Sequence, residues 1–289
     1  MNEVLVALST PFLNGKLNKE GLINHVESLI KAGVDGFFLL GTTGLGMVMS
    51  TDEKREVMNA VKEVAGRKKL IAHVGAAVID DVIKTAQDAA KLELDAVASV
   101  PPIYYKPDEP TLIKYYTKIR ETSGLPVYIY NIPQNSGFNV TPSHAAQMRT
   151  IIAGVKDSTG DIGQVAGFVD LGLEVFNGAD HAILPSLVVG AHGAVSAMAN
   201  VVPELEIKLF REYNANNFNK AMDIQRTITR VRDIIKKYPT PAAYYWAASV
   251  LRGYELGDVK EPLRVLSDEE KNALKKELDD LTHSGGISL

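Results

Sequence analysis

The 289-residue sequence contains no cysteine. This absence excludes disulfide bonds, cysteine-ligated zinc and thiol catalysis. The sequence also lacks an apolar stretch long enough to span a membrane, and its N-terminal apolar segment is too short for a signal peptide and has no basic leader. We therefore expect a soluble cytoplasmic protein that has no membrane partner.

Segments dense in lysine and arginine are missing too, and the formal net charge is -4. Both features argue against a nucleic acid as partner. Hydrophobic residues at 46% and charged residues at 23% are ordinary for a globular chain and permit a large core. The histidines do not have the spacing of a metal site, so we expect no metal. They are His25, His73, His144, His181, His192 and His283.

Short apolar runs alternate with segments whose apolar residues recur at helical spacing. The predicted strands start near residues 4, 36, 70, 95, 126, 152, 173 and 193, a period typical of βα units. Continuous apolar strands indicate a parallel sheet covered on both faces, and eight such units favour an α/β fold closed into a (β/α)₈ TIM barrel. An open doubly wound sheet is the alternative, but no Gly-x-Gly-x-x-Gly follows the first strand.

Beyond about residue 200 the pattern predicts helices only. Their expected ranges are Glu204 to Tyr213, Asn219 to Lys237, Pro241 to Arg252 and Asp268 to Leu281. We interpret the first as the eighth barrel helix, so that residues 1–215 form the barrel carrying the active site and residues 216–289 a C-terminal helical extension. Helix starts are predicted at the capping boxes Ser50/Glu53 and Ser267/Glu270, and a frayed tail at 285–289.

Lys156 ends an apolar run and is followed at once by polar residues, so it is predicted to lie at the end of a buried strand. Apolar surroundings disfavour the charged form of a lysine and lower its pKa, and the neutral amine then attacks carbonyl groups. Lys156 is therefore a candidate for forming a Schiff base. The alternative is a lysine that is solvated or ion-paired, as most lysines beyond a strand are.

Other polar residues follow the remaining strands, where a barrel binds its ligands. Thr42 and Thr43 lie between glycines in Gly41 to Gly46, which suits either a carboxylate or simple helix capping. Tyr130 suits either proton relay or a hydrogen-bonded core position. For Tyr105 we expect packing against a neighbour, and for Asp180 the capping of the next helix.

In combination, these segments resemble the dihydrodipicolinate synthase/N-acetylneuraminate lyase family of class I aldolases, and the resemblance runs through the whole barrel. The segments that carry it are GTTG at 41–44, YY at 104–105, YNIP at 130–133, GVKDSTGD at 154–161, NGAD at 177–180 and GAHGAVS at 190–196.

The resemblance implies a (β/α)₈ barrel with C-terminal helices, usually a homotetramer, in which Lys156 forms an imine with pyruvate. It makes Tyr130 the proton relay and completes a hydroxyl relay with Thr42 and with Tyr104, which is expected to enter from a neighbouring subunit. Thr43 is expected to bind the pyruvate carboxylate. The carbonyls of Gly178 and Val195 are expected to line the pocket. No cofactor is expected, because the imine itself serves as the electron sink.

The sequence departs from dihydrodipicolinate synthases, which carry a glutamate where Leu45 stands and an arginine where Asn135 stands. GTTGLG instead resembles the archaeal 2-keto-3-deoxygluconate aldolases, which cleave a sugar acid to pyruvate and glyceraldehyde. Relatives that accept the 6-phosphorylated substrate hold phosphate with cations near the loop after the fourth strand, where Lys106 lies, and with a tyrosine that Ile132 replaces here. We therefore favour the unphosphorylated sugar acid.

The sequence leaves three alternative functions open. Dihydrodipicolinate synthase would join pyruvate to aspartate semialdehyde, and an N-acetylneuraminate lyase-like enzyme would be another pyruvate aldolase. A non-catalytic barrel that binds a keto acid and regulates a partner is a different class, which would not need Lys156, Tyr130 and Thr42 together.

Overall fold

The computed structural model describes residues 2–281, so the predicted tail at 285–289 lies outside the described residues. The predicted fold is confirmed: eight parallel strands close into a barrel in the order β1-β10-β9-β8-β7-β6-β5-β4. The strands are β1 (Glu3–Ala7), β4 (Gly36–Leu39), β5 (Lys69–His73), β6 (Ala96–Ser99), β7 (Val127–Asn131), β8 (Gly154–Asp157), β9 (Glu174–Asn177) and β10 (Gly193–Ser196).

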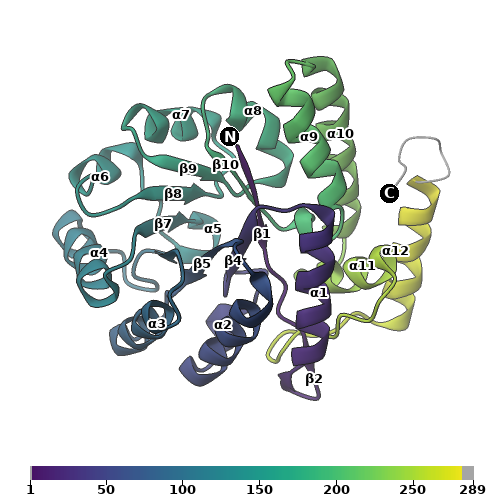
Figure 1. Cartoon of the computed structure of the whole chain (residues 1–289), viewed down its shortest axis with the longest axis horizontal. Coiled ribbons are helices and arrows are strands. Elements are labelled where there is room, and N and C mark those ends of the chain that lie inside the picture. The colour runs from purple at the N-terminus through teal and green to yellow at the C-terminus, as the bar shows by residue number, and fades with distance from the viewer. Residues whose placement is uncertain (1, 282–289) are drawn as a thin grey trace.

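Helices surround these strands in Figure 1, because each strand is apolar on both faces and must be covered from outside. The helices that follow successive strands are α1 (Lys19–Ala32), α2 (Thr51–Ala65), α3 (Ile79–Lys91), α4 (Glu109–Ser123), α5 (Pro133–Ser136), α6 (Pro142–Gln147), α7 (Ile162–Asp170), α8 (Ile183–Val188) and α9 (Pro203–Asn214). A short hairpin of β2 (Phe12–Leu13) and β3 (Lys16–Leu17), which the sequence pattern did not predict, joins β1 to α1.

Two apolar layers result from the alternation of side chains along the strands. Leu5 and Ala7 of β1 and Phe38 of β4 belong to the cluster that fills the barrel. Val4 and Val6, which alternate with them, belong to the larger cluster between the strands and the helices. The barrel interior is thus packed with side chains, which leaves the carboxyl end of the strands as the place for a site.

The C-terminal helices are α10 (Phe218–Ile235), α11 (Ala242–Arg252) and α12 (Asp268–Leu281), and they gather on one side of the barrel in Figure 1. Their ends agree with the predicted ones to within two residues. α10 packs along α9 and also contacts α8 and the 3₁₀ helix η2 (Asp180–Ala182). The division of the chain at residue 215 stays a prediction about domain organisation.

Local signals for helix starts are confirmed. Ser50 and Glu53 exchange their capping hydrogen bonds at the start of α2, and Ser267 and Glu270 do the same at α12.

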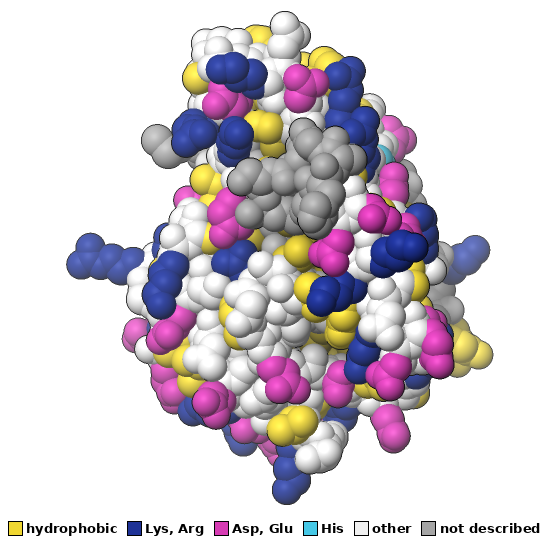
Figure 2. Space-filling view, turned by 90° about the vertical axis from the view of Figure 1, so that its right-hand side faces the viewer, with side chains coloured by type: hydrophobic (Ala, Val, Ile, Leu, Met, Phe, Trp, Pro, Cys, Tyr) yellow, Lys and Arg dark blue, Asp and Glu magenta, His cyan; other side chains and the backbone are white. Residues whose placement is uncertain are grey.

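Acidic and basic side chains are interspersed on the face that carries the C-terminal helices (Figure 2). No helix of residues 2–281 is long and apolar enough to cross a membrane.

Candidate active site

Lys156 lies near the carboxyl end of β8, with its backbone opposite Tyr130 of β7 on one side and Phe176 of β9 on the other. Its side chain is 4% exposed, and Nζ lies 4.0 Å from the ring centroids of both Phe38 and Tyr130. Burial lowers the pKa of Lys156 to about 7, and the negative charge of Asp180 opposes this effect. Near neutral pH a large fraction of the amine is therefore uncharged and nucleophilic.

Tyr130 and Thr42 form a hydroxyl pair beside this amine. The phenol oxygen of Tyr130 lies 3.1 Å from Thr42 Oγ1. Burial raises the pKa of Tyr130 to about 12, although the hydroxyls of Thr42 and Ser158 favour the ionised form. The phenol is therefore protonated at neutral pH, with a hydroxyl neighbour able to donate to it or accept from it.

The turn after β4 holds Thr42 and Thr43 through backbone contacts that only glycine permits. A Cβ on Gly44 would lie 2.6 Å from the Leu8 carbonyl oxygen, and one on Gly46 would overlap the Leu40 carbonyl. The capping alternative for the two threonines is wrong, because α2 begins after Ser50, which caps it.

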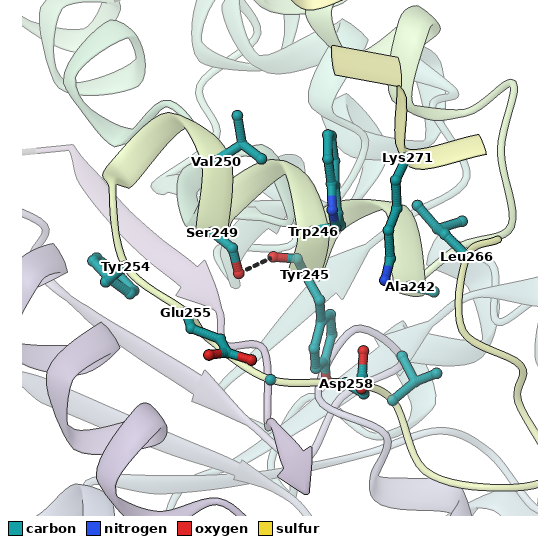
Figure 3. Close-up of a pocket in the computed structure, with 12 residues that line it drawn as sticks. Ala242, Tyr245, Trp246, Ser249, Val250, Tyr254, Glu255, Asp258, Leu266 and Lys271 are labelled. Atoms are coloured by element: carbon teal, nitrogen blue, oxygen red, sulfur yellow. Dashed lines mark hydrogen bonds between the residues drawn. The ribbon is translucent and has the colours of Figure 1, made fainter. Parts of the chain in front are cut away.

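Tyr245 of α11 supports the same turn from the C-terminal helices. Its hydroxyl donates to the Thr43 carbonyl over 2.8 Å and accepts from the Thr10 amide over 2.8 Å. Tyr245 also lines a cavity of about 340 Å³ between α11 and the chain that follows it, which is distinct from the cavity at the barrel end (Figure 3). Within α11, the Ser249 hydroxyl donates to the Tyr245 carbonyl. α11 is thereby tied to the threonine pair.

A cavity of about 390 Å³ at the carboxyl end of the barrel contains most of the predicted site residues. Those that line it are Lys156, Tyr130, Thr42, Thr43, Gly178 and Val195. Gly178 must be glycine here, because a Cβ would overlap the Ser158 hydroxyl and lie 3.1 Å from Lys156 Cε. The structure thus brings together residues that come from five different strand ends.

Tyr104 and Lys106 do not line this cavity within one chain. The loop that carries them turns outward, so Lys106 is exposed and Tyr104 is 88% exposed with φ of 73°. Lys106 therefore does not reach the substrate pocket within one chain, and its role in substrate binding stays a prediction. Tyr105 is not packed either: it is 80% exposed and touches the Tyr104 ring edge-on.

Two cations that the sequence analysis missed line the cavity from the C-terminal helices. Arg232 of α10 is partly buried and Lys236 follows one turn later, exposed at the surface. Residues four apart share one helix face. Two basic residues at this spacing were therefore the sequence pattern that could have indicated a cationic helix face at the site. Polar residues at strand ends do not reveal it, because both cations lie at or just beyond the end of a helix.

Asp180 also lines the cavity, but its predicted role as a helix cap is wrong. Asp180 Oδ1 accepts hydrogen bonds from Ser196 Oγ over 2.7 Å and from the Ala197 amide over 3.1 Å, while the 3₁₀ helix at this point has no side-chain cap. Within residues 2–281, no group of three or more histidine, aspartate or glutamate side chains is arranged to hold a metal ion.

Comparisons with known proteins agree with this geometry. Residues 1–281 match the model of the dihydrodipicolinate synthetase family. A 2-dehydro-3-deoxy-phosphogluconate/2-dehydro-3-deoxy-6-phosphogalactonate aldolase of Sulfurisphaera tokodaii is 32% identical over 280 residues, covering 96% of each chain.

A second relative, the 4-hydroxy-tetrahydrodipicolinate synthase of Methanocaldococcus jannaschii, is 30% identical and covers 96% of this chain and 98% of its own. Among solved structures, a variant of the Sulfolobus solfataricus 2-keto-3-deoxygluconate aldolase superposes with a TM-score of 0.93 at 29% identity, covering 98% of this chain and 97% of the other.

Proposed function

This chain belongs to the dihydrodipicolinate synthetase family, and from that membership and the site geometry we propose that it is a class I aldolase, a carbon–carbon lyase acting through a Schiff base on Lys156. One observation carries the proposal. A buried lysine amine, with its pKa lowered to about 7, lies against the ring of a tyrosine whose phenol is hydrogen-bonded to a threonine hydroxyl.

The proposed reaction begins with attack of the neutral Lys156 amine on the C2 carbonyl of a 2-keto acid. The Tyr130 phenol donates its proton to the departing hydroxyl, so water leaves and an iminium cation forms beside the phenolate. The phenolate then accepts the proton of the C4 hydroxyl while the C3–C4 bond breaks. The electron pair of that bond moves into the iminium and gives an enamine, and the aldehyde departs.

Protonation of the enamine at C3 and hydrolysis of the imine release pyruvate and restore the free amine. Thr42 is within hydrogen-bond distance of the Tyr130 phenol, so it is the first station for proton exchange with solvent. Thr43 is proposed to bind the substrate carboxylate, and the carbonyls of Gly178 and Val195 to line the pocket beside it. No cofactor enters this scheme.

For the substrate, we propose 2-keto-3-deoxygluconate, cleaved reversibly to pyruvate and glyceraldehyde. The names of the Sulfurisphaera and Sulfolobus relatives support a sugar acid. Lys156 and Lys236 line the same cavity, and Lys156 is buried while Lys236 is exposed. The cavity therefore leads from the reactive amine to the surface, which suits an extended substrate. Arg232 and Lys236 supply positive charge along that path, so we include the 6-phosphorylated sugar acid as a second substrate even though Ile132 replaces the expected tyrosine.

We further propose a homotetramer in which Tyr104 of one chain completes the hydroxyl relay of its neighbour. A non-glycine residue with φ of 73° is strained, and such strain persists where the surroundings or a function require it. Beside it, Tyr105 and Ile79 line a hollow of about 810 Å³ and are 80% and 44% exposed. Exposed apolar side chains of this kind favour a protein contact.

Borohydride reduction in the presence of pyruvate tests the covalent step. Mass spectrometry is expected to find one pyruvate adduct per chain, on Lys156, and none in Lys156→Ala. Lys54 provides a matched control, because it is also buried with a lowered pKa but does not line the cavity, so Lys54→Met is expected to retain the adduct. An adduct on another lysine, or none at all, contradicts the mechanism.

A panel of aldehydes with saturating pyruvate tests the substrate. Glyceraldehyde and its 3-phosphate are expected to be the productive acceptors, whereas preference for aspartate semialdehyde would make the enzyme a dihydrodipicolinate synthase. Preference for N-acetylmannosamine would indicate an N-acetylneuraminate lyase. Adduct formation without turnover on any aldehyde would favour the keto-acid-binding regulator.

A further inference from the structure

Ser196 of β10 joins two acidic side chains deep beside the active site. Its Oγ lies 2.7 Å from Asp180 Oδ1 and is hydrogen-bonded to Glu206 Oε1 of α9. The Ala199 amide also donates to Ser196 Oγ, over 3.1 Å. All three side chains are nearly or fully buried, with exposures of 6% for Asp180, 1% for Ser196 and 0% for Glu206.

Counting protons shows that one of the two acids must be neutral. A serine hydroxyl has one proton to donate and two lone pairs to accept with. The Ala199 amide uses one lone pair, and the serine proton satisfies one carboxyl oxygen. The other carboxyl must therefore donate its own proton to the remaining lone pair, because two ionised carboxylates facing one hydroxyl would leave one of them unpaired and repelled.

Glu206 is the acid that the surroundings make neutral. Its second oxygen, Oε2, has no hydrogen-bond partner among the described residues, and an ionised carboxylate buried in this way would be very costly. Asp180 instead receives a second donor, the Ala197 amide. Burial, reinforced by the negative charge of Asp180, raises the pKa of Glu206 well above its usual value.

We propose that Glu206 is a protonated positioning residue, which donates to Ser196 so that Ser196 donates to Asp180 and holds the Asp180 carboxylate in the active-site cavity. The assignment rests on the proposed function in one respect: the iminium on Lys156 is the cation that this carboxylate stabilises. A neutral Glu206 keeps the charge of the acid pair at minus one.

The charged and titratable groups around the Glu206–Ser196–Asp180 hydrogen bonds are consistent with the positioning role. The charge of Asp180 favours the protonated form of Lys156 on β8, and it acts in the same sense on His181 of η2 and on Lys236 beyond α10. Tyr244 of α11 lines the same cavity, and burial together with the charge of Asp180 raises the pKa of its phenol. Asp180 thus acts on Lys156, His181 and Lys236 alike, while Asp233 of α10 pairs with Arg232 and also favours the protonated forms of His181 and Lys236.

Difference infrared spectroscopy tests the protonation state without relying on activity. The wild-type protein at neutral pH is expected to show the C=O stretch of a protonated carboxyl group, and Glu206→Gln is expected to lose it. Glu204→Gln is the matched control, because Glu204 lies on the same helix but is exposed and pairs with Arg252. A wild-type spectrum with no band that depends on Glu206 overturns the proposal.

The pH dependence of pyruvate trapping on Lys156 tests the positioning role. Ser196→Ala breaks the link to Asp180, so the midpoint of adduct formation is expected to fall by about one pH unit as the amine loses its counter-charge. Glu206→Gln retains a neutral donor and is expected to keep the wild-type midpoint, whereas Glu206→Leu shifts it in the same direction as Ser196→Ala.

The positioning role is contradicted if the pH midpoint of adduct formation shifts equally in Glu206→Gln and Ser196→Ala. It is also contradicted if the midpoint stays unchanged in both Ser196→Ala and Glu206→Leu. If the wild-type protein forms no adduct on Lys156, the proposed function fails instead, and the infrared comparison still decides whether Glu206 is protonated.

Discussion

Replacing the buried amine should make this protein more stable while abolishing its chemistry. In Lys156→Met the unbranched stem remains and the ionisable group disappears. Burial lowers the pKa of Lys156 from 10.5 to about 7, and a pKa difference of one corresponds to about 1.4 kcal/mol. At pH 7 the wild-type folded state is therefore expected to be less stable than the variant by about 4 kcal/mol.

The pH dependence has a definite sign. Between the folded pKa near 7 and the unfolded value of 10.5, the unfolded chain binds more protons at Lys156 than the folded chain does. The free energy of unfolding of the wild type, relative to that of Lys156→Met, therefore rises with pH between about 7 and 10.5. Below about pH 7 this relative stability is constant and at its minimum. The advantage of the variant should shrink from about 4 kcal/mol at pH 7 to less than about 1 kcal/mol near pH 10.5.

Thermal unfolding of both proteins at neutral and alkaline pH measures this difference, and other titrating groups cancel between them. At roughly 2 °C for each kcal/mol, the Tm of Lys156→Met should exceed that of the wild type by about 8 °C at pH 7. Lys220→Met is the control, because Lys220 is an exposed lysine on α10, and it should leave Tm unchanged. An unchanged Tm in Lys156→Met, or a gain that is the same at alkaline pH, refutes the reasoning.

The barrel was predictable because its strands are buried on both faces. Such strands appear as uninterrupted apolar runs, and every predicted start agrees with the structure to within two residues. The position of Lys156 followed for the same reason. A charged residue that ends an apolar run stands at the rim of the barrel, and parallel pairing then places it opposite Tyr130.

The contribution of the C-terminal helices could not be predicted from these runs. Arg232 and Lys236 reach the cavity only because α10 packs against α8, α9 and η2, and no periodicity in the sequence encodes that packing. The role of Asp180 could not be predicted for a related reason. An aspartate just before a helix usually caps it, but here Ser196, sixteen residues later, lies close enough to bind its carboxylate.

Two further variants test how the cavity is shaped and supported. In Gly178→Ala the new methyl group would overlap the Ser158 hydroxyl and displace Lys156, so pyruvate trapping by borohydride is expected to slow by about 100-fold; trapping at the wild-type rate would show that the glycine is dispensable. Tyr245→Phe removes the donor to the Thr43 carbonyl and the acceptor of a buried amide. We expect it to lose about 1–3 kcal/mol of stability and to raise KM for pyruvate more than it lowers kcat, because the loosened turn carries the hydroxyl proposed to bind the carboxylate. Steady-state kinetics would contradict this if KM stayed constant while stability fell, since Tyr245 would then support the fold without ordering Thr43.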